Sequence, residues 1–478
     1  MKKRSLCLSA AAALAVAAAL AGCGSTTYFA GRVLPPSGIA NRVLIAIQNP
    51  SSVTRGALQF VDAYYDIRSS ADNKTPMFSI SGFSAALPTT IQNMPEEQMA
   101  AVYGSGDGSL TLINYAKEST GPAVQGLNGP SSSVFITRNQ SFAFAASQAS
   151  HVLTVVDRTN GSSYALSLPG VYRVSVNAGG TAAIAFVQNS NFAYYPRKLT
   201  AAETISYSGG SSTWPKAAMD CEPVNAPGWC LFQAQDPQTG LPLAFDRPTK
   251  AVFSADGSTA YVLSCGLECG GVNASVSALS VAPMIFLVGQ GSGVLPTQAA
   301  LNTATIQTLG GASNALLASS TLYVVGQQPV QSGGQTLYGG NLTLVNLANN
   351  TASAPISISD GAPGAVSRMV LADDNTLWIG MTKCINGPRY NTGEPYGCLT
   401  MFNTSTGKVT LLESYLGDAT GIAAVTGLHK VYAAVGGQVY IYSTVDGTSI
   451  DNQYVTVTGT AYDVAYMDAI TDGDNTVY

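Results

Sequence analysis

The chain has 478 residues, of which only 10% are charged, and its formal net charge is -5. An average soluble domain carries about 25% charged residues, so the polar surface here must come mainly from Ser, Thr, Asn, Gln and Gly. This balance excludes a surface basic enough to hold a phosphate backbone, and we expect no nucleic-acid partner. Length alone suggests about three domains, unless the chain is built from repeats.

The N-terminus predicts export and a lipid anchor. A basic start (KKR, residues 2–4) precedes an Ala/Leu-rich run that is too short to span a bilayer. The run ends in LAGC (residues 20–23), which resembles the bacterial lipobox. The resemblance implies cleavage before Cys23 and attachment of membrane lipid to its thiol. Gly24, where an inner-membrane lipoprotein has Asp, implies the outer membrane of a bacterial cell envelope. An ordinary secretory signal with an incidental cysteine is the alternative.

A hairpin pattern recurs along the chain. The segment KAVFSADGSTAYVLS, from Lys250, has an apolar run, a tight polar turn and a second run with a central aromatic residue. Third runs such as SLTLINYAK and fourth runs such as KVTLLES follow most of these pairs. Period-2 alternation between Gly, Asn and Asp turns predicts antiparallel four-stranded units. First strands are expected at Thr89, Ser133, Arg173, Lys250, Asn314, Arg368, Gly421 and Tyr462.

Repeated four-stranded units of about 40 to 50 residues predict an all-β fold, a β-propeller. The number of first strands favours eight blades, and seven is the alternative if a degenerate copy is a loop. The N-terminal region offers three strands without a first strand, and the C-terminus offers a first strand without a blade. We expect these ends to pair and close the ring, which removes open sheet edges. The predicted divisions are a signal peptide (1–22), a lipidated tether (23–40) and one propeller domain (41–478).

Two segments carry a family resemblance. VFSADGSTAYVLS and LTMFNTSTGKVTLLES resemble the YVTN-type propeller repeat, and the likeness covers most of residues 130–460. This family includes seven-bladed lactonases, in which a central funnel with His, Arg and acidic residues opens a sugar lactone. The resemblance implies a propeller with a site in its channel. Only two His residues, His151 and His429, are available for such chemistry here. We expect His151 to begin a third strand and His429 to lie in a tight turn.

Six cysteines remain once Cys7 and Cys23 are assigned to the leader and the anchor. In an oxidising compartment we expect local disulfides, although sequence alone does not fix the connectivity. A zinc site at the CxxxC pair is the competing interpretation. We expect no metal and no cofactor. The expected pairs are Cys221 with Cys230, Cys265 with Cys269, and Cys384 with Cys398.

The long connections predict one decorated face. We assign the insertion at residues 209–248 to a fourth-to-first connection, which would gather all six cysteines at the same end of the ring. Loops on a rigid scaffold often carry binding residues, and exposed aromatic and Arg side chains often anchor partners. The alternatives are that the disulfides only protect these loops from proteolysis, and that Trp229 packs beneath its own loop. The candidate anchors are Trp214, Trp229, Arg389, Tyr390 and Tyr396.

The first strands also predict a charged level in the channel. Arg173, Lys250, Arg368 and Asp463 fall at equivalent places near the strand starts, with Ser133, Asn314 and Gly421 at the others. Three cations with one acid suit an anionic small molecule, whereas simple solvation at a channel mouth is the alternative. Together these features favour a noncatalytic, lipid-anchored binding or assembly platform for an envelope protein or glycan. The alternative is a lactonase-like enzyme, which would need a carboxylate, a cation and a His that converge in the funnel.

Overall fold

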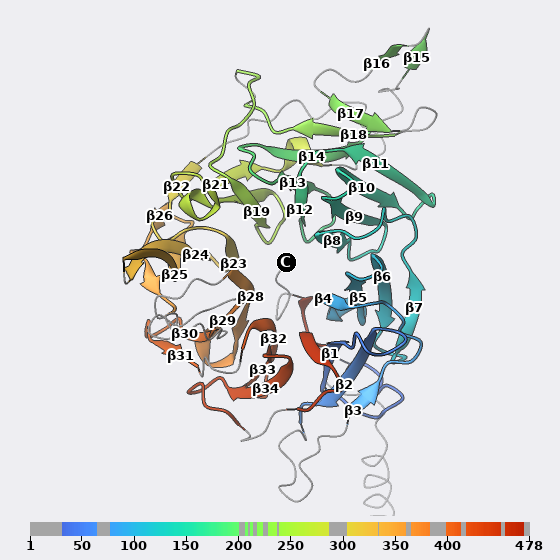
Figure 1. Ribbon diagram of the computed structural model, residues 1–478, viewed down its shortest axis with the longest axis vertical. Helices are drawn as coiled ribbons and strands as arrows, with labels where there is room; N and C mark the ends of the chain where they lie inside the picture. Colours follow the sequence, from blue (N-terminus) through green and yellow to red (C-terminus); the bar gives the residue numbers. More distant parts are fainter. Residues whose placement is uncertain are drawn as a thin grey trace, which may run out of the picture.

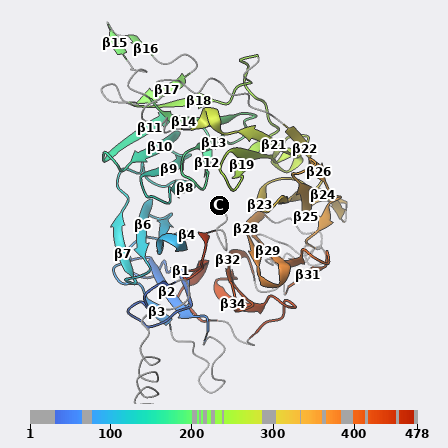
Figure 2. The ribbon, with the colours of Figure 1, turned by 180° about the vertical axis from the view of Figure 1, so that it is seen from behind.

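Eight β-sheets surround a central channel in the computed structural model (Figure 1). The same closed ring is visible from behind (Figure 2). The expected eight-bladed propeller is therefore confirmed. No helix in the described part of the chain is long and apolar enough to cross a membrane. The structure describes residues 31–64, 77–199, 206–208, 211–213, 218–222, 228–236, 239–285, 304–332, 334–359, 365–382, 398–412, 417–450 and 455–472.

Each blade begins with an inner strand beside the channel and ends at the outer rim. Blade 1 contains β35 (Thr460–Tyr466), β1 (Arg42–Gln48), β2 (Gly56–Asp62) and β3 (Met77–Ser79). Blade 2 contains β4 (Pro88–Met94), β5 (Met99–Gly104), β6 (Ser109–Asn114) and β7 (Ser119–Ala123). Blade 3 contains β8 (Ser133–Ile136), β9 (Phe142–Ser147), β10 (Val152–Asp157) and β11 (Ser162–Ser167). Blade 4 contains β12 (Val171–Val176), β13 (Ala183–Val187), β14 (Ala193–Lys198), β18 (Trp229–Gln233) and β17 (Ala218–Glu222).

The second half of the ring follows the same plan. Blade 5 contains β19 (Pro248–Phe253), β20 (Thr259–Ser264), β21 (Ser275–Ser280) and β22 (Ala304–Gln307). Blade 6 contains β23 (Asn314–Ala318), β24 (Thr321–Ser332), β25 (Gln335–Asn346), β26 (Thr351–Ala352) and β27 (Ile356–Ser357). Blade 7 contains β28 (Ala365–Ala372), β29 (Thr376–Thr382), β30 (Cys398–Asn403) and β31 (Val409–Leu411), and blade 8 contains β32 (Ala419–Val425), β33 (Lys430–Val435) and β34 (Gln438–Ser443). Outside the blades are the hairpin β15 (Ser206–Ser208) and β16 (Ser211–Thr213), and the 3-10 turns η2 (Pro95–Glu97), η3 (Gly266–Cys269), η4 (Ala282–Met284) and η5 (Asp373–Asn375).

The two ends of the ring differ in their connections. At the turn face, first strands pass to second strands through tight turns such as residues 254–258. There the Asp256 carboxylate accepts hydrogen bonds from the Ser254 hydroxyl (2.5 Å) and the Ser258 backbone N–H (3.1 Å), which lower its pKa to about 2. Gly257 completes this turn with a φ of 69°, a conformation that favours glycine. At the opposite loop face, second strands pass to third strands, as at residues 265–274.

The middle strands are buried on both sides because each blade lies between two others. Every residue of β9 (FAFAAS) and of β33 (KVYAAV) is buried. Both strands combine larger side chains with alanines, alternating with Phe at the start of β9 and adjacent to each other in β33, which lets neighbouring sheets approach closely. The core therefore consists of separate layers between blades rather than one central cluster.

Pairing of the chain ends closes the ring as expected. The C-terminal strand β35 pairs antiparallel with β1, from Tyr466 opposite Val43 to Thr460 opposite Gln48. Beside this joint, Arg42 is fully buried and binds both carboxylate oxygens of Asp468, at 3.0 and 2.7 Å. Its third nitrogen donates to the Tyr115 carbonyl (2.7 Å) and to Glu118 (3.0 Å) in blade 2. We call Arg42, Asp468 and Glu118 the closing cluster.

The predicted tether is partly packed onto the propeller. The Ser37 hydroxyl donates to Glu118 (2.5 Å), and the Arg32 guanidinium donates to the Pro95 carbonyl (2.6 Å). Ile39 joins the hydrophobic layer between blades 1 and 2. The described part of the chain before β1 is thus held against the ring.

Blade 4 differs from the sequence prediction. The insertion at 209–248 supplies the fourth strand itself, β18, and a fifth strand, β17, which pairs with β18 at the outer rim. Cys221 and Cys230 face each other across this pair and are bonded. Because β14 runs toward the turn face and Cys230 pairs with Arg197 near its end, this disulfide lies toward the turn face.

The cysteines are therefore not gathered at one face. Cys265 and Cys269 are bonded and lie directly after β20, at the loop face. This bond also overturns the zinc interpretation of the CxxxC pair. Local pairing is confirmed for these two disulfides, whereas the Cys384–Cys398 pair lies outside the residues whose side chains are described.

The middle strands of blade 6 form an unusually long hairpin. The strands β24 and β25 pair along their full length, from Thr321 opposite Asn346 to Ser332 opposite Gln335. The Gln-, Gly- and Pro-rich composition of residues 327–340 is typical of loops. Here the two halves satisfy each other's backbone hydrogen bonds, so the segment continues the sheet as a long hairpin.

Candidate binding site in the central channel

In each blade, one residue of the first strand lies at the same height along the channel. This residue pairs with a residue near the C-terminal end of the second strand, as Lys250 does with Leu263 and Arg368 with Gly380. A β-bulge directly precedes the position in blades 2, 4, 5, 7 and 8, and a bulge changes the direction of the side chain that follows it. The pairing register places one residue of each first strand at this level, and Thr90 joins those expected from the sequence. They are Thr90, Ser133, Arg173, Lys250, Asn314, Arg368, Gly421 and Asp463.

Lys250 occupies the middle of three basic residues that we call the channel cations, Arg173, Lys250 and Arg368. It is only 4% exposed, and its ammonium nitrogen donates to the Asn314 side-chain oxygen at 2.7 Å. Burial, with the positive charges of Arg173 and Arg368, holds the pKa of Lys250 well below its usual range. The three side chains therefore interact electrostatically although they come from three different blades. This burial of Lys250 argues against the alternative of simple solvation at a channel mouth.

The single acid at this level, Asp463, forms an ion pair with Arg368. The guanidinium of Arg368 contacts the Asp463 carboxylate at 2.5 Å, across the position of Gly421 in blade 8. A side chain at Gly421 would meet the Asp463 backbone at 2.6 Å and its carboxylate at 2.7 Å. Asp463 also accepts from the Ile91 backbone N–H (2.8 Å), and burial raises the pKa of Asp463. The glycine thus leaves room for the acid, whose negative charge compensates one of the three cations.

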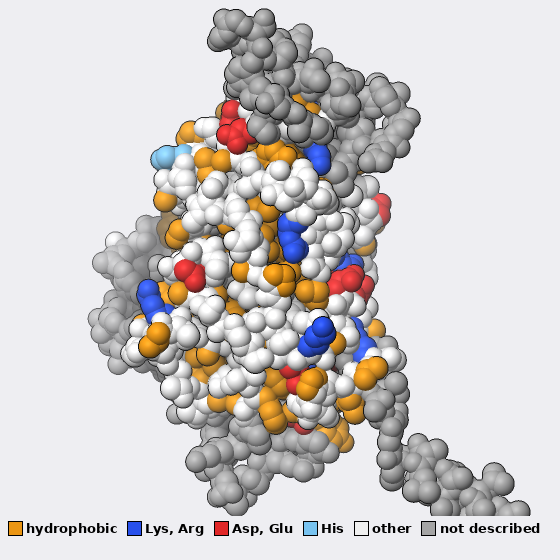
Figure 3. Space-filling model, turned by 90° about the vertical axis from the view of Figure 1, so that its right-hand side faces the viewer, with side chains coloured by type: hydrophobic (Ala, Val, Ile, Leu, Met, Phe, Trp, Pro, Cys, Tyr) orange, Lys and Arg blue, Asp and Glu red, His pale blue; other side chains and the backbone are white. Residues whose placement is uncertain are grey.

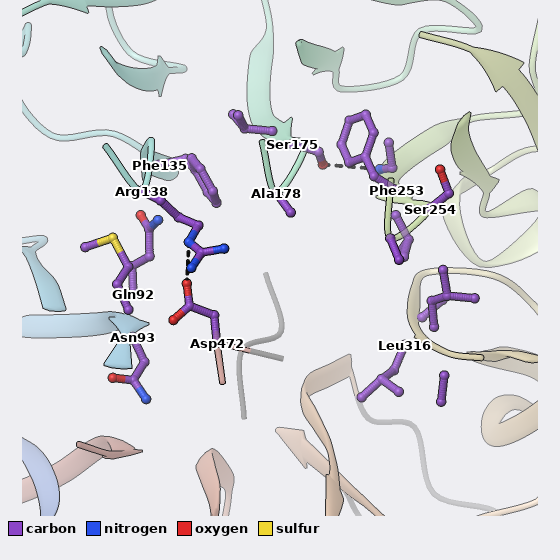
Figure 4. Close-up of a pocket in the computed structure, with 18 of the residues that line it drawn as sticks. Gln92, Asn93, Phe135, Arg138, Ser175, Ala178, Phe253, Ser254, Leu316 and Asp472 are labelled. Atoms are coloured by element: carbon purple, nitrogen blue, oxygen red, sulfur yellow. Dashed lines mark hydrogen bonds and ion pairs between the residues drawn. The ribbon is translucent and has the colours of Figure 1, made fainter. Parts of the chain in front are cut away.

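A cavity of about 510 Å³ occupies the channel between this level and the turn face. Its volume lies within the usual range for small-molecule sites, about 300–1,000 Å³. Arg138 and Asp472 form an ion pair (2.7 Å) on one side, and Phe253 and Leu316 lie across the cavity from them (Figure 4). Arg138 also pairs with Glu96 in the neighbouring turn of blade 2.

The two His residues lie away from this cavity. His151 begins the third strand of blade 3 at the loop face, in a left-handed conformation (φ 60°). His429 lies in the turn between β32 and β33, where its Nδ1 is 2.8 Å from the Asp374 carboxylate. That hydrogen bond raises the pKa of His429. Both positions agree with the sequence prediction, and neither His lines the cavity.

Trp229 is not an exposed anchor. It is fully buried between blades 3 and 4, with ring centroids 5.6 Å from Phe142 and 6.2 Å from Phe144. The cause is its place in β18, a strand of the sheet rather than a loop. The other proposed anchors, the lipidation residue and part of one disulfide lie outside the described residues. They are Cys23, Trp214, Cys384, Arg389, Tyr390 and Tyr396.

Charged residues on the side of the ring shown in Figure 3 are scattered singly or in small groups among neutral and hydrophobic ones. The described residues on this side therefore form no broad basic surface. Within the part of the chain that the structure describes, no group of His, Cys, Asp or Glu residues has a metal-binding arrangement.

No known family and no curated protein matches the sequence. Among solved structures, the periplasmic gluconolactonase of Pseudomonas aeruginosa is 14% identical, with a TM-score of 0.44 over 89% of this chain and 98% of that chain. A 6-phosphogluconolactonase candidate from Bacteroides uniformis is 12% identical, with a TM-score of 0.44 over 89% and 99%. Dihydro-heme d1 dehydrogenase is 11% identical, with a TM-score of 0.49 over 90% and 75%. Similarity this low transfers neither a substrate nor a site residue to this chain.

Proposed function

We propose that the protein is a lipid-anchored propeller of the bacterial cell envelope that binds a small anionic molecule in its central channel without converting it. The observation that carries the proposal is the set of three channel cations, Arg173, Lys250 and Arg368, with Asp463 as the single acid at their level. Because burial and the repulsion of the two Arg residues disfavour the charged form of Lys250, an anion beside it would restore protonation and bind favourably.

The cysteines and the N-terminal segment support the proposed location in the cell envelope. The two disulfides are typical of proteins that fold outside the cytoplasm. Lipid on Cys23 would hold the propeller at the membrane surface, and the outer membrane is the location that Gly24 favours. An envelope protein or glycan remains the proposed macromolecular partner of the platform. Substituting Cys23→Ser should release the exported protein from membranes, which fractionation after a high-salt wash would measure.

Calorimetric titration of acetate tests the channel site. The wild-type protein should bind acetate, whereas Lys250→Met and Arg173→Met should each weaken binding by about tenfold, the loss of one charged contact. Lys408→Met is the matched control, because Lys408 is exposed in a turn of blade 7. Equal binding by all four proteins, or none by the wild type, would contradict the proposal.

The second candidate is a lactonase-like hydrolase, which the repeat resemblance favours. The positions of His151 and His429 count against it, because neither reaches the channel cavity. Proton release from D-glucono-1,5-lactone at neutral pH would test this candidate. Hydrolysis above the spontaneous rate that is lost in Arg368→Met would replace the binding proposal with the enzyme.

A further inference from the structure

The cavity at the turn face lies apart from the channel cations. None of Arg173, Lys250 and Arg368 is among the residues that line it. Two of its lining residues, Ala178 and Ala255, are exposed and lie in turns at the turn face. A molecule in solution can therefore reach the cavity from this face, and the chemistry of the wall determines what can bind there.

The charged side chains of the wall, Glu96, Arg138 and Asp472, bind one another. The guanidinium of Arg138 contacts one oxygen of Glu96 and one oxygen of Asp472, the latter at 2.7 Å (Figure 4). The second oxygen of Asp472 accepts from the Glu96 backbone N–H at 2.9 Å, and the second oxygen of Glu96 accepts from the Asp472 backbone N–H at 3.1 Å. All four carboxylate oxygens are thus hydrogen bonded within the protein. A charged ligand would have to break one of these contacts or lose its hydration without replacement.

The uncharged polar side chains of the wall also have partners within the protein. The Gln92 amide donates to the Ile136 carbonyl (2.6 Å) and accepts from the Ile136 N–H (2.8 Å), which joins the first strands of blades 2 and 3. The Ser175 hydroxyl accepts from the Ala251 N–H (3.2 Å), which joins blades 4 and 5 in the same way. The other two are engaged as well, Asn93 with Tyr115 and Ser254 with Asp256.

The rest of the wall is apolar and comes from six consecutive blades. Its larger hydrophobic side chains are Met94, Phe135, Val176, Phe253, Leu316 and Leu371. Phe253 and Leu316, which lie across the cavity from Arg138 in Figure 4, are only partly buried. Covering such side chains contributes about 25 cal/mol per Å² of apolar surface removed from water. The wall therefore favours a ligand with hydrophobic surface and disfavours one that carries a charge.

We infer that this cavity is a second binding site, which takes an uncharged, largely apolar small molecule. The inference goes beyond the proposed function, because the anion is proposed to bind at the channel cations and this ligand needs none of them. The cavity volume of about 510 Å³ is that of a site for a drug-sized ligand. A compound with a fused aromatic ring system is therefore a suitable probe.

Fluorescence of N-phenyl-1-naphthylamine, an uncharged probe that brightens in apolar surroundings, provides the test. The wild-type protein should bind the probe, and three competitors of similar shape then measure the preference for charge. They are 2-naphthylmethanol, 2-naphthoate and 2-naphthylmethylammonium. We expect the alcohol to displace the probe at concentrations about tenfold lower than either ion does, because each ion loses hydration in the cavity. Acetate in excess should not displace the probe.

Filling the cavity tests the location of the site. Ala178 is exposed in a turn and points toward the cavity (Figure 4), so Ala178→Trp places a large side chain there without changing a strand. We expect the probe to bind about tenfold more weakly, since the indole occupies the volume that the ring system needs. Ala348→Trp is the matched control, because Ala348 is an exposed alanine in an outer turn, and it should bind the probe as the wild type does.

Each result decides a separate point. No fluorescence gain with the wild type, or an unchanged gain in Ala178→Trp, would overturn the site. Displacement by either ion at the same concentration as the alcohol would overturn the uncharged class of ligand. Displacement by acetate would show that the cavity and the channel cations form one site, and would overturn the second site. Acetate binding itself is measured in the separate calorimetric titration, so the proposed function can fail while this site stands.

Discussion

Two buried charge clusters, one at the ring closure and one in the channel, show how the same residue types serve different purposes. In the closing cluster, one cation, Arg42, has two carboxylates and a carbonyl, so each of its nitrogens has an acceptor. In the channel, three cations lie at one level with a single acid, Asp463, which contacts only Arg368 among them. Breaking a buried ion pair is costly because it leaves a charge without its partner, whereas buried like charges that lack nearby counter-charges are costly even in the intact protein. This difference is the reason that we propose the channel, and not the ring closure, as the binding site.

Breaking the closing cluster should have the largest effect on stability. In Asp468→Ala, the fully buried Arg42 loses its principal counter-charge, and the free energy of unfolding should fall by about 3–5 kcal/mol. Urea denaturation followed by tryptophan fluorescence would measure the loss. The double variant Arg42→Met, Asp468→Leu should recover part of it, because it leaves no unpaired charge. A loss as small as that of Asp446→Ala, in an exposed turn, would show that the cluster does not hold the ring closed.

Filling the space beside Asp463 should have the next-largest effect on stability. In Gly421→Ala, the added carbon would lie 2.6 Å from the Asp463 backbone, so strands β32 and β35 must separate. Overpacking of this kind should lower the free energy of unfolding by about 2 kcal/mol, and acetate binding should weaken because Arg368 loses its support. Gly179→Ala is the control, since its nearest neighbouring atoms lie 4.0 Å away. Equal stability of the two variants would show that the glycine is not required.

Glu118 tests whether balance within the closing cluster is graded. It is the more exposed of the two acids, at 9% of its side chain, and Asp468 remains to compensate Arg42 when it is changed. Glu118→Gln keeps the shape and removes the charge, so we expect a loss of about 1.5 kcal/mol by urea denaturation. A loss equal to that of Asp468→Ala would mean that the two acids act as one unit rather than as principal and secondary partners.

The repeating part of this fold was predictable from sequence because its signals are local. Turn residues such as Asp256 and Gly257 mark the first-to-second turns, and these turns fix the register that brings Arg173, Lys250 and Arg368 to one level. The closure of blade 1 was predictable from the order of the strands. The N-terminal region lacks a first strand, and the C-terminus supplies one.

The errors arose where pairing depends on distant partners. Trp229 follows a polar insertion beside a cysteine, which is typical of a loop, but β18 completes blade 4 because β14 leaves an unpaired edge there. The closing cluster was missed for a similar reason. Arg42 and Asp468 are 426 residues apart, and only an Arg at the head of an otherwise apolar strand, RVLIAIQ, signals a buried partner.

Lys250 offers the smallest effect and the clearest contrast, because its removal should stabilise the protein. Its pKa in the folded state is lowered by burial and by the two neighbouring Arg residues, so between the folded and the ordinary pKa the unfolded chain binds a proton that the folded chain does not. Wild-type stability should therefore rise with pH toward about 10. In Lys250→Met this slope disappears, and at pH 7 the free energy of unfolding should increase by about 1 kcal/mol after the lost hydrogen bond to Asn314 is counted.

Thermal unfolding at pH 7 and pH 9.5 would measure this gain in stability, which should shrink at the higher pH. Lys408→Met is the control. A lower melting temperature at pH 7, or a gain that does not depend on pH, would place Lys250 with Arg42 among the structural charges and remove the contrast between the two clusters.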